Sequence, residues 1–491
     1  MGHLNLISLL GIFVMIGLAW AVSSHRTKVN WRLVIVGVLL QAMLAAMLFQ
    51  SQNWKFDQQF QDIAAARLAV ETGEFPAESV ETFLQTHDDS QADVATAISI
   101  PRYPQGILFS GVNSFFAAVN AYVNEGSNFV FKAYDVEGSQ PADATVMLRT
   151  FAFGVLPTVI FFASLMSILY YLGVMQFVIK VMAWVMQKTL GTSGPESMAA
   201  AANVLVGHTE APLVIRPYLE KMTRSELNAL MVGGFATISG SLMAIFVFYG
   251  ISAGHLLTAS IISAPAALVI AKVLQPETET APDLDKLEPA PEQYATNVIE
   301  AAAIGASDGV KLAINITGML IAFLALLAML NAMLIGLGEL VEHLINLFRG
   351  DDPIDVQWSI DNLFATLFFP LAWIMGIESG DCSIAGELLG KKVAVNEFIA
   401  YSEMGEILKG TVVGDDGEIV SMSERTKIIL TYALCGFSNF GAIGIQIGGI
   451  GPLAPSRRRD LAQLGLRAMF GGMLAACMTA CMAGMMYGVL R

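Results

Sequence analysis

The sequence has little charge. Only 14% of its 491 residues are charged and 55% are hydrophobic, and the mean hydropathy is +0.60. The core of a soluble protein of this size cannot hide so much hydrocarbon. Many runs approach or exceed the roughly 18 apolar residues that cross a bilayer. The alternating short strands of a transmembrane barrel are missing, so the composition predicts an all-α membrane protein with many spans.

Cysteine and basic residues are also scarce. The four cysteines all lie in apolar sequence, and Cys477 and Cys481, which share a helix face, have no nearby His or acidic residues, so we expect packing residues and no metal site. The net charge of −15 argues against a nucleic-acid partner and mainly reflects acidic loops outside the membrane. An intramembrane protease is not expected either, because Ser379-Gly380-Asp381 has no obvious partner Asp in a second span. The sequence therefore predicts a protein that is not an enzyme.

The first apolar run covers residues 4–22. A cleaved signal peptide is the alternative, but no Lys or Arg precedes the run, whereas Arg26, Lys28 and Arg32 follow it. The positive-inside rule then places residues 23–32 in the cytoplasm and the N-terminus outside. On the same basis Arg425 and Lys427 lie externally, as exceptions to a statistical rule.

Hydropathy, charge and helix breakers divide the rest of the chain into spans, surface helices and loops. Spans are expected at 33–49, 150–172, 226–249, 255–273, 310–335, 424–447 and 460–488, and re-entrant hairpins at 192–219 and 363–404. Interfacial helices are expected at 107–131, 175–189 and 297–309, a cytoplasmic linker at 275–296, and external segments at 51–105, 336–361 and 405–423. The resulting units are 1–50, 51–105 (an acidic external insertion), 106–190, 191–273 (first repeat), 274–361 and 362–491 (second repeat).

Two similar stretches, residues 201–212 and 389–398, each place a glutamate, Glu210 or Glu397, in apolar sequence. Each follows an Ala-Trp-x-Met segment and precedes a Gly-Phe break. Paired, interrupted hydrophobic segments in two halves of a membrane protein indicate a transport site. Three crossings separate the two hairpins, and an odd number inverts the second repeat. The fold class predicted is eight transmembrane helices plus two re-entrant hairpins in an inverted repeat.

Polar residues at matching places of the repeat are the candidates for the site. A carboxylate in hydrocarbon costs roughly 2.5–3.5 kcal/mol on insertion scales. Glu210 and Glu397 therefore face a partner or a wet cavity, although either alone would fit a buried ion pair or a helix cap. Thr237 and Asn439 follow the two Gly-Phe breaks and suit a polar ligand or an ion, the alternative being hydrogen bonds between helices.

These stretches resemble the concentrative nucleoside transporter family. The resemblance is carried by Gly191–Gly194, Gly207–Pro212 with the following Arg216–Thr223, Ile261–Pro265, Asn396–Phe398 and Cys435–Gly451. It covers about residues 150–490 and the first two spans, whereas residues 51–105 lie outside the usual pattern. It implies a homotrimer in the lipid of the cell inner membrane that imports nucleosides with a sodium or proton gradient and needs no organic cofactor.

The resemblance also implies roles for individual residues. The first hairpin tip would bind the base, and the second hairpin with the broken span after it would bind the ribose. The substrate positions are His208, Thr209, Glu210, Leu242, Glu397, Phe437, Asn439 and Ala442. Sodium would be held by oxygens of Asn203, Val206, Thr237 and Ile238.

Two positions depart from the family pattern. His208 stands where Gln is common, and Ala442 stands where Ser is common. A neutral His offers one donor and one acceptor, as Gln does, but in a different geometry. The loss of the Ser hydroxyl removes one ribose contact. Sodium coupling is expected because Asn203 and Thr237 are present, and proton coupling involving His208 or Glu210 is the alternative. A scaffold protein that recruits a partner through residues 51–105 is a further alternative.

Overall fold

The computed structural model describes residues 2–49, 115, 122–123, 156–208, 210–279, 295–349, 358–413 and 419–487. Helices dominate these residues, and the pairing of Val413 with Ile419 is an isolated bridge. The whole of the acidic segment 51–105 lies outside the described residues, as do nearly all of the amphipathic segment 107–131 and most of the linker 275–296. Within the described residues, five helices are long and apolar enough to cross a membrane, and a sixth is added if one bent pair counts as a single span.

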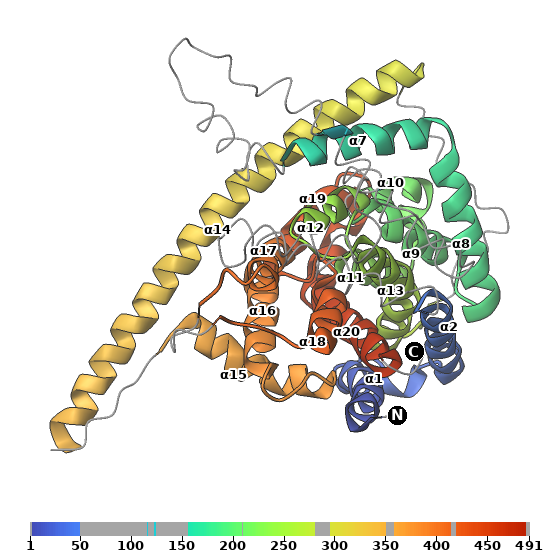
Figure 1. Ribbon diagram of the computed structural model, residues 1–491. Coiled ribbons are helices and arrows are strands. Elements are labelled where there is room, and N and C mark those ends of the chain that lie inside the picture. Colours follow the sequence, from blue (N-terminus) through green and yellow to red (C-terminus); the bar gives the residue numbers. More distant parts are fainter. Residues whose placement is uncertain are drawn as a thin grey trace, which may run out of the picture.

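The N-terminal helices α1 (His3–Ala21) and α2 (Trp31–Phe49) agree with the first two expected spans. Both pack on α13 (Ala253–Leu274) and α20 (Arg458–Met486), which lie at the centre of the bundle (Figure 1). Small residues permit this close approach. A Cβ on Gly11 would lie 2.4 Å from the carbonyl oxygen of Ile374, and one on Gly37 would lie 2.2 Å from Val269.

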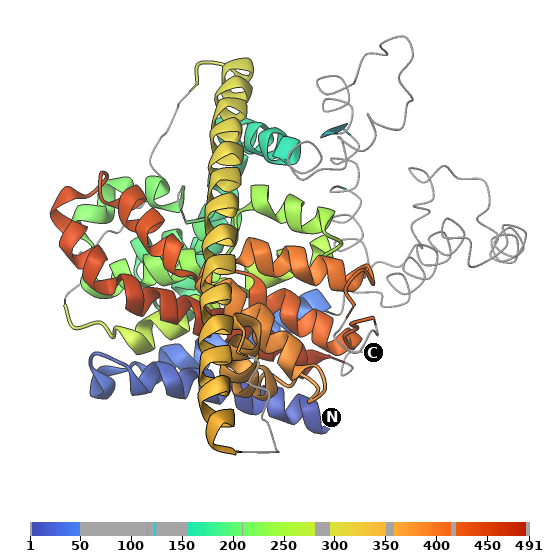
Figure 2. The same cartoon turned by 90° about the vertical axis from the view of Figure 1, so that its left-hand side faces the viewer.

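Helices α7 (Leu156–Tyr171) and α8 (Val174–Leu190) lie where the span 150–172 and the interfacial helix 175–189 were expected, and they meet at an angle of 75°. Gly173 sits at the bend with a φ of 78°, a conformation that favours glycine. Helix α7 packs along α14 (Val298–Arg349), which runs along the outside of the bundle (Figures 1 and 2).

The expected division of this region into an interfacial helix at 297–309, a span at 310–335 and an external loop from 336 was wrong. Residues 298–349 form one helix of 52 residues. They contain no proline, and glycine alone did not break the helix. At about 1.5 Å per residue the helix is about 78 Å long. It is therefore much longer than the roughly 30 Å hydrocarbon core and extends beyond it.

The first repeat contains a hairpin, a broken helix and a continuous helix. The hairpin arms are α9 (Gly194–Val206) and the short α10 (Ala211–Val214), which continues into η3 (Arg216–Lys221). The expected span 226–249 is interrupted, because α11 (Arg224–Ala236) ends before α12 (Gly240–Phe248) begins. Helix α13 completes the repeat.

The second repeat has the same order. Helices α16 (Cys382–Ala394) and α17 (Glu397–Leu408) form the hairpin, α18 (Glu424–Leu434) and α19 (Phe440–Ile450) form the broken helix, and α20 is continuous. The expected start of this hairpin at 363 falls in a separate helix, α15 (Ile360–Ile374). This helix carries the second Ala-Trp-x-Met segment, as α8 carries the first, so α15 corresponds to α8 rather than to a hairpin arm.

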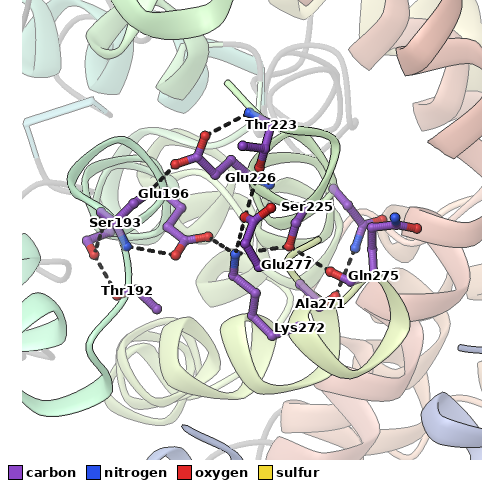
Figure 3. A network of polar contacts seen from close by, with 12 residues as sticks. Thr192, Ser193, Glu196, Thr223, Ser225, Glu226, Ala271, Lys272, Gln275 and Glu277 are labelled. Atoms are coloured by element: carbon purple, nitrogen blue, oxygen red, sulfur yellow. Dashed lines mark hydrogen bonds and ion pairs between the residues drawn. The ribbon is translucent and has the colours of Figure 1, made fainter. Parts of the chain in front are cut away.

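A polar junction fixes the start of the first repeat (Figure 3). The buried Lys272 at the end of α13 pairs with Glu196 of α9 at 2.5 Å and donates to Ser225 of α11 at 3.0 Å. Ser193, before α9, donates to Glu226 of α11 at 2.5 Å. Three elements are thereby joined at one end, because each supplies a partner that the others need.

The second repeat has a junction at the corresponding ends of its helices. Arg425 of α18 is buried and donates to the Gly376 carbonyl at 2.7 Å, Asn5 Oδ1 at 2.8 Å and Ser8 Oγ at 2.9 Å. Asn5 in turn donates to the carbonyl of Met485 at the end of α20. The sequence placed Arg425 on the external side as an exception to the positive-inside rule. These three hydrogen bonds stabilise its buried charge there.

Candidate functional site

The two breaks face each other at the centre of the bundle. Gly436, with a φ of 138°, lies against the end of α11, so that a Cβ there would be 2.7 Å from the carbonyl oxygen of Phe235. The ring of Phe437 lies 4.3 Å from that of His208, centroid to centroid, in an edge-to-face arrangement. The structure therefore brings the first hairpin tip to the break of the second repeat.

His208 is buried at this tip, and neither ring nitrogen has a hydrogen-bond partner within the described residues. Gly207 before it has a φ of 82°. A Cβ on Gly234 of α11 would come within 2.6 Å of the His208 Cβ and 2.7 Å of Gln446 Nε2. A side chain at 234 would displace the imidazole. Two unpaired buried nitrogens are costly without a ligand or water.

The other two residues expected at the tip are Thr209 and Glu210. Thr209 lies outside the described residues. Glu210 is exposed and directly precedes the one-turn helix α10, without a side-chain hydrogen bond that caps it. Its exposed carboxylate is open to a polar ligand.

The second hairpin brings Glu397 to the break of its own repeat. Asn439 Nδ2 donates to Glu397 Oε2 at 3.1 Å, and both side chains are buried. Asn439 Oδ1 accepts from the backbone N–H of Ala442 at 2.8 Å and so caps α19. The one amide therefore fixes both the helix start and the carboxylate. Ala442 is buried. Leu242 is buried in the first turn of α12, directly after the other break.

The four residues expected to bind sodium are all buried where α9 meets the first break. Asn203 Nδ2 donates to the Leu230 carbonyl at 3.3 Å, but its Oδ1 has no hydrogen-bond partner among the described residues. Thr237 directly follows α11 and donates to the Gly233 carbonyl at 2.9 Å, which leaves its oxygen lone pairs as acceptors. Val206 is the last residue of α9, and Ile238 lies in the break. Uncharged oxygens in a buried place suit a hard cation such as sodium.

Two polar residues were not predicted as site residues. Ser438 lies between Phe437 and Asn439, and its buried hydroxyl has no partner in the described part of the chain. Gln446 donates to the Met231 carbonyl at 3.2 Å, and its Oε1 is likewise unpartnered there. Their signal in the sequence is a polar residue within an apolar run. Among the described residues no three His, Cys, Asp or Glu side chains cluster as a transition-metal site would require.

Family models match most of the chain. The model described as Na+ dependent nucleoside transporter N-terminus matches residues 10–64, that of nucleoside recognition (Gate) matches 152–253, and that of Na+ dependent nucleoside transporter C-terminus matches 255–484. An uncharacterized transporter from Haemophilus influenzae is 46% identical over 372 residues, which are 76% of this chain and 83% of the relative.

Animal proteins are similar over nearly the whole chain. Solute carrier family 28 member 3 from Eptatretus stoutii is 38% identical over 99% of this chain, and sodium/nucleoside cotransporter 1 from Mus musculus is 35% identical over 98%. The alignments span 61% and 64% of those two proteins, which are longer than this chain.

Solved structures of CNTnw have the same fold. A mutant in an outward-facing state matches with a TM-score of 0.78, and an inward-facing substrate-bound state matches with 0.77. Both are 36% identical, and each alignment covers 99% of this chain, with 99% and 98% of the respective CNTnw chain. The chain therefore belongs to the concentrative nucleoside transporter family.

Proposed function

We propose that this protein imports nucleosides by sodium symport. The observation that carries the proposal is the meeting of two broken helices, with an unpartnered buried oxygen of Asn203 beside one break and a buried carboxylate of Glu397 beside the other. Broken helices present free backbone groups at membrane depth, which are tolerated where they line a ligand cavity. The similarity to sodium-dependent nucleoside transporters supports nucleosides as substrates and sodium as the coupling ion.

The two ends of a nucleoside need different partners. In our proposal the base lies at the first hairpin tip, against His208, Thr209 and Glu210, and the ribose lies at Glu397 and Asn439. The edge-to-face pair of His208 and Phe437 offers an apolar surface to a flat base. A carboxylate held by an amide is a strong acceptor for ribose hydroxyls. Leu242 and Ala442 would shape the walls.

We expect sodium coupling because the proposed sodium site and the proposed base site share the first hairpin. Asn203, Val206, Thr237 and Ile238 would hold the ion directly behind the His208 tip. Bound sodium satisfies Asn203 Oδ1 and fixes the end of α9, which leads into Gly207 and His208. Ion binding thereby orders the hairpin tip before the base binds. Nucleoside affinity should consequently rise with sodium concentration, and by linkage the reverse holds as well.

Proton coupling remains the second candidate. The observation in its favour is His208, whose unpartnered imidazole is a proton acceptor at the same tip. The sodium mechanism is preferred because the Asn203 and Thr237 oxygens form a site without a titratable group.

The membrane arrangement is part of the proposal. If α11–α12 and α18–α19 each count as one broken span, the spans number the expected eight, and the two hairpins enter from opposite sides. We place the protein in the cell inner membrane, surrounded by lipid, as a homotrimer. The exposed apolar side chains along α14, including Ile314, Ile321 and Met333, supply a face that lipid or neighbouring copies cover.

Uptake by reconstituted protein tests the function. Proteoliposomes should accumulate radiolabelled uridine or adenosine when an inward sodium gradient is imposed, and accumulation should stop when choline replaces sodium. Accumulation that ignores sodium and follows an imposed pH gradient would favour the proton candidate. Failure to concentrate any nucleoside of a panel would refute the proposal as a whole.

A further inference from the structure

The two broken helices share an electrostatic feature. A helix that stops inside the protein leaves its last carbonyl groups without helical partners, and these carry partial negative charge. Helix α11 stops at Ala236 and α18 stops at Leu434. Each end lies in the buried centre of the bundle, where a positive partner is favourable.

Within the described residues, the side chains that hydrogen-bond carbonyl groups in the C-terminal half of α11 are neutral: Asn203, Thr237 and Gln446. Asn203, three residues before the end of α9, donates to the carbonyl of Leu230, six residues before the end of α11, and its Oδ1 has no partner among the described residues. This is the place that the proposed function gives to sodium. The positive charge would therefore come from solution.

At the end of α18 the protein supplies the charge itself. Lys392 lies two residues before the end of α16, and its Nζ donates to the carbonyl of Ala433 at 2.7 Å. Ala433 is the penultimate residue of α18. The lysine is only 1% exposed, which ranks it among the largest fully buried side chains described. A buried ammonium is expensive unless it is compensated.

The compensation comes from the same break. Glu397 attracts Lys392 electrostatically, although no described carboxylate lies within ion-pair distance of the ammonium, and the hydrogen bond to the Ala433 carbonyl is its direct polar contact. Glu397 lies with Asn439 at the start of α19, the positive end of the second half-helix. The second hairpin thus presents a positive group to the negative end of α18 and a negative group to the positive end of α19.

We propose that Lys392 is a tethered cation that takes, in the second repeat, the place that the coupling sodium takes in the first. The inference rests on the proposed function. Its consequence is stoichiometric: with the second place occupied by an ammonium, one positive charge enters with each nucleoside. Lys392 is a positioning residue for Glu397 and does not contact the substrate.

Two substitutions separate charge from hydrogen bonding. Lys392→Gln keeps a donor for the Ala433 carbonyl and removes the charge, whereas Lys392→Arg keeps both. Membrane current and radiolabelled uptake, measured on the same proteoliposomes, give the charge moved per nucleoside. Wild type and Lys392→Arg should move one. Lys392→Gln should move two, because a second cation from solution replaces the ammonium, and its sodium dependence should be steeper.

The outcomes distinguish this inference from the proposed function. Wild-type uptake that needs no sodium refutes the sodium assignment. If wild-type uptake is driven by sodium but Lys392→Gln still moves one charge per nucleoside, the role given to Lys392 is refuted and the proposed function stands. If Lys392→Gln folds but does not transport, its melting temperature in detergent should rise more steeply with sodium than that of wild type, and an equal slope overturns the inference. If Lys392→Gln does not fold, the charge that the wild-type protein moves per nucleoside is the test. One charge is expected, and two or more charges contradict a tethered cation.

Discussion

Replacing Asn439 by Asp separates the two tasks of this side chain. Its Oδ1 caps α19 through the Ala442 N–H, and its Nδ2 holds Glu397 at 3.1 Å. Aspartate is as good an N-cap as asparagine, so Asn439→Asp preserves the start of the helix. It removes the donor to Glu397 and puts a second carboxylate in its place. The fold should therefore persist while the ribose side of the site is lost.

The magnitude follows from the contact. A hydrogen bond to a charged group contributes about 1.5–3 kcal/mol, which corresponds to about a tenfold to hundredfold change in affinity. Two carboxylates at the observed 3.1 Å would repel by about 5 kcal/mol at an effective dielectric constant of about 20. The pair relieves this repulsion by moving apart or by binding a proton. Nucleoside affinity of Asn439→Asp should thus fall at least about tenfold.

Titration calorimetry of the detergent-solubilised protein measures the affinity, and thermal unfolding measures the fold. Ser359→Asp is a matched control, because Ser359 caps α15 by accepting from Asn362 N and lies at another helix start. It should change neither quantity. Wild-type affinity in Asn439→Asp, with the protein folded, would refute the placement of the ribose at this pair.

The other predictions concern the base, the ion and the first junction. His208→Gln should alter the ranking of purine and pyrimidine nucleosides in competition assays, and an unchanged ranking would leave His208 a packing residue. Thr237→Val should raise the half-saturating sodium concentration at least about tenfold, the effect of losing about 1.4 kcal/mol of binding. Nucleoside affinity at saturating sodium should hardly change, and Thr431→Val, which loses the same kind of buried hydroxyl-to-carbonyl bond, should behave as wild type. Lys272→Met leaves Glu196 buried without its partner and should reduce unfolding free energy by about 3–5 kcal/mol, as measured by denaturation in detergent. Lys311→Met removes an exposed pair with a lysine side chain 70% exposed and should have almost no effect, and equal losses in both variants would contradict the argument.

Much of the architecture could be predicted from the sequence, because apolar runs, prolines and charged loops are local signals. The hairpin around Glu210 and the continuous helix α13 were placed within a few residues. The predicted division of residues 297–361 into an interfacial helix, a span and an external loop was wrong, because it assumed that the helix ends where polar residues begin. In α14 helical hydrogen bonds continue through Glu339 and Glu342, which need not be in hydrocarbon.

The site was only partly predictable, because its contacts join distant parts of the chain. Pattern and resemblance placed Glu397 and Asn439 on the same side of the site, and the structure joins them by a hydrogen bond. The roles of Lys392 and Arg425 depend on which carbonyl or amide the folded chain puts within reach, and the sequence does not contain that distance. Polar partners of this kind become visible only when the tertiary fold is known.

A structure determined by electron cryo-microscopy with sodium and a nucleoside bound tests the central claim most directly. Our account predicts nucleoside density between the His208 tip and Glu397, with the ribose at Asn439, and ion density among the oxygens of Asn203 and Thr237. Nucleoside density elsewhere in the bundle, or a nucleoside in this place with the Asn203 oxygen still unpartnered, would contradict it.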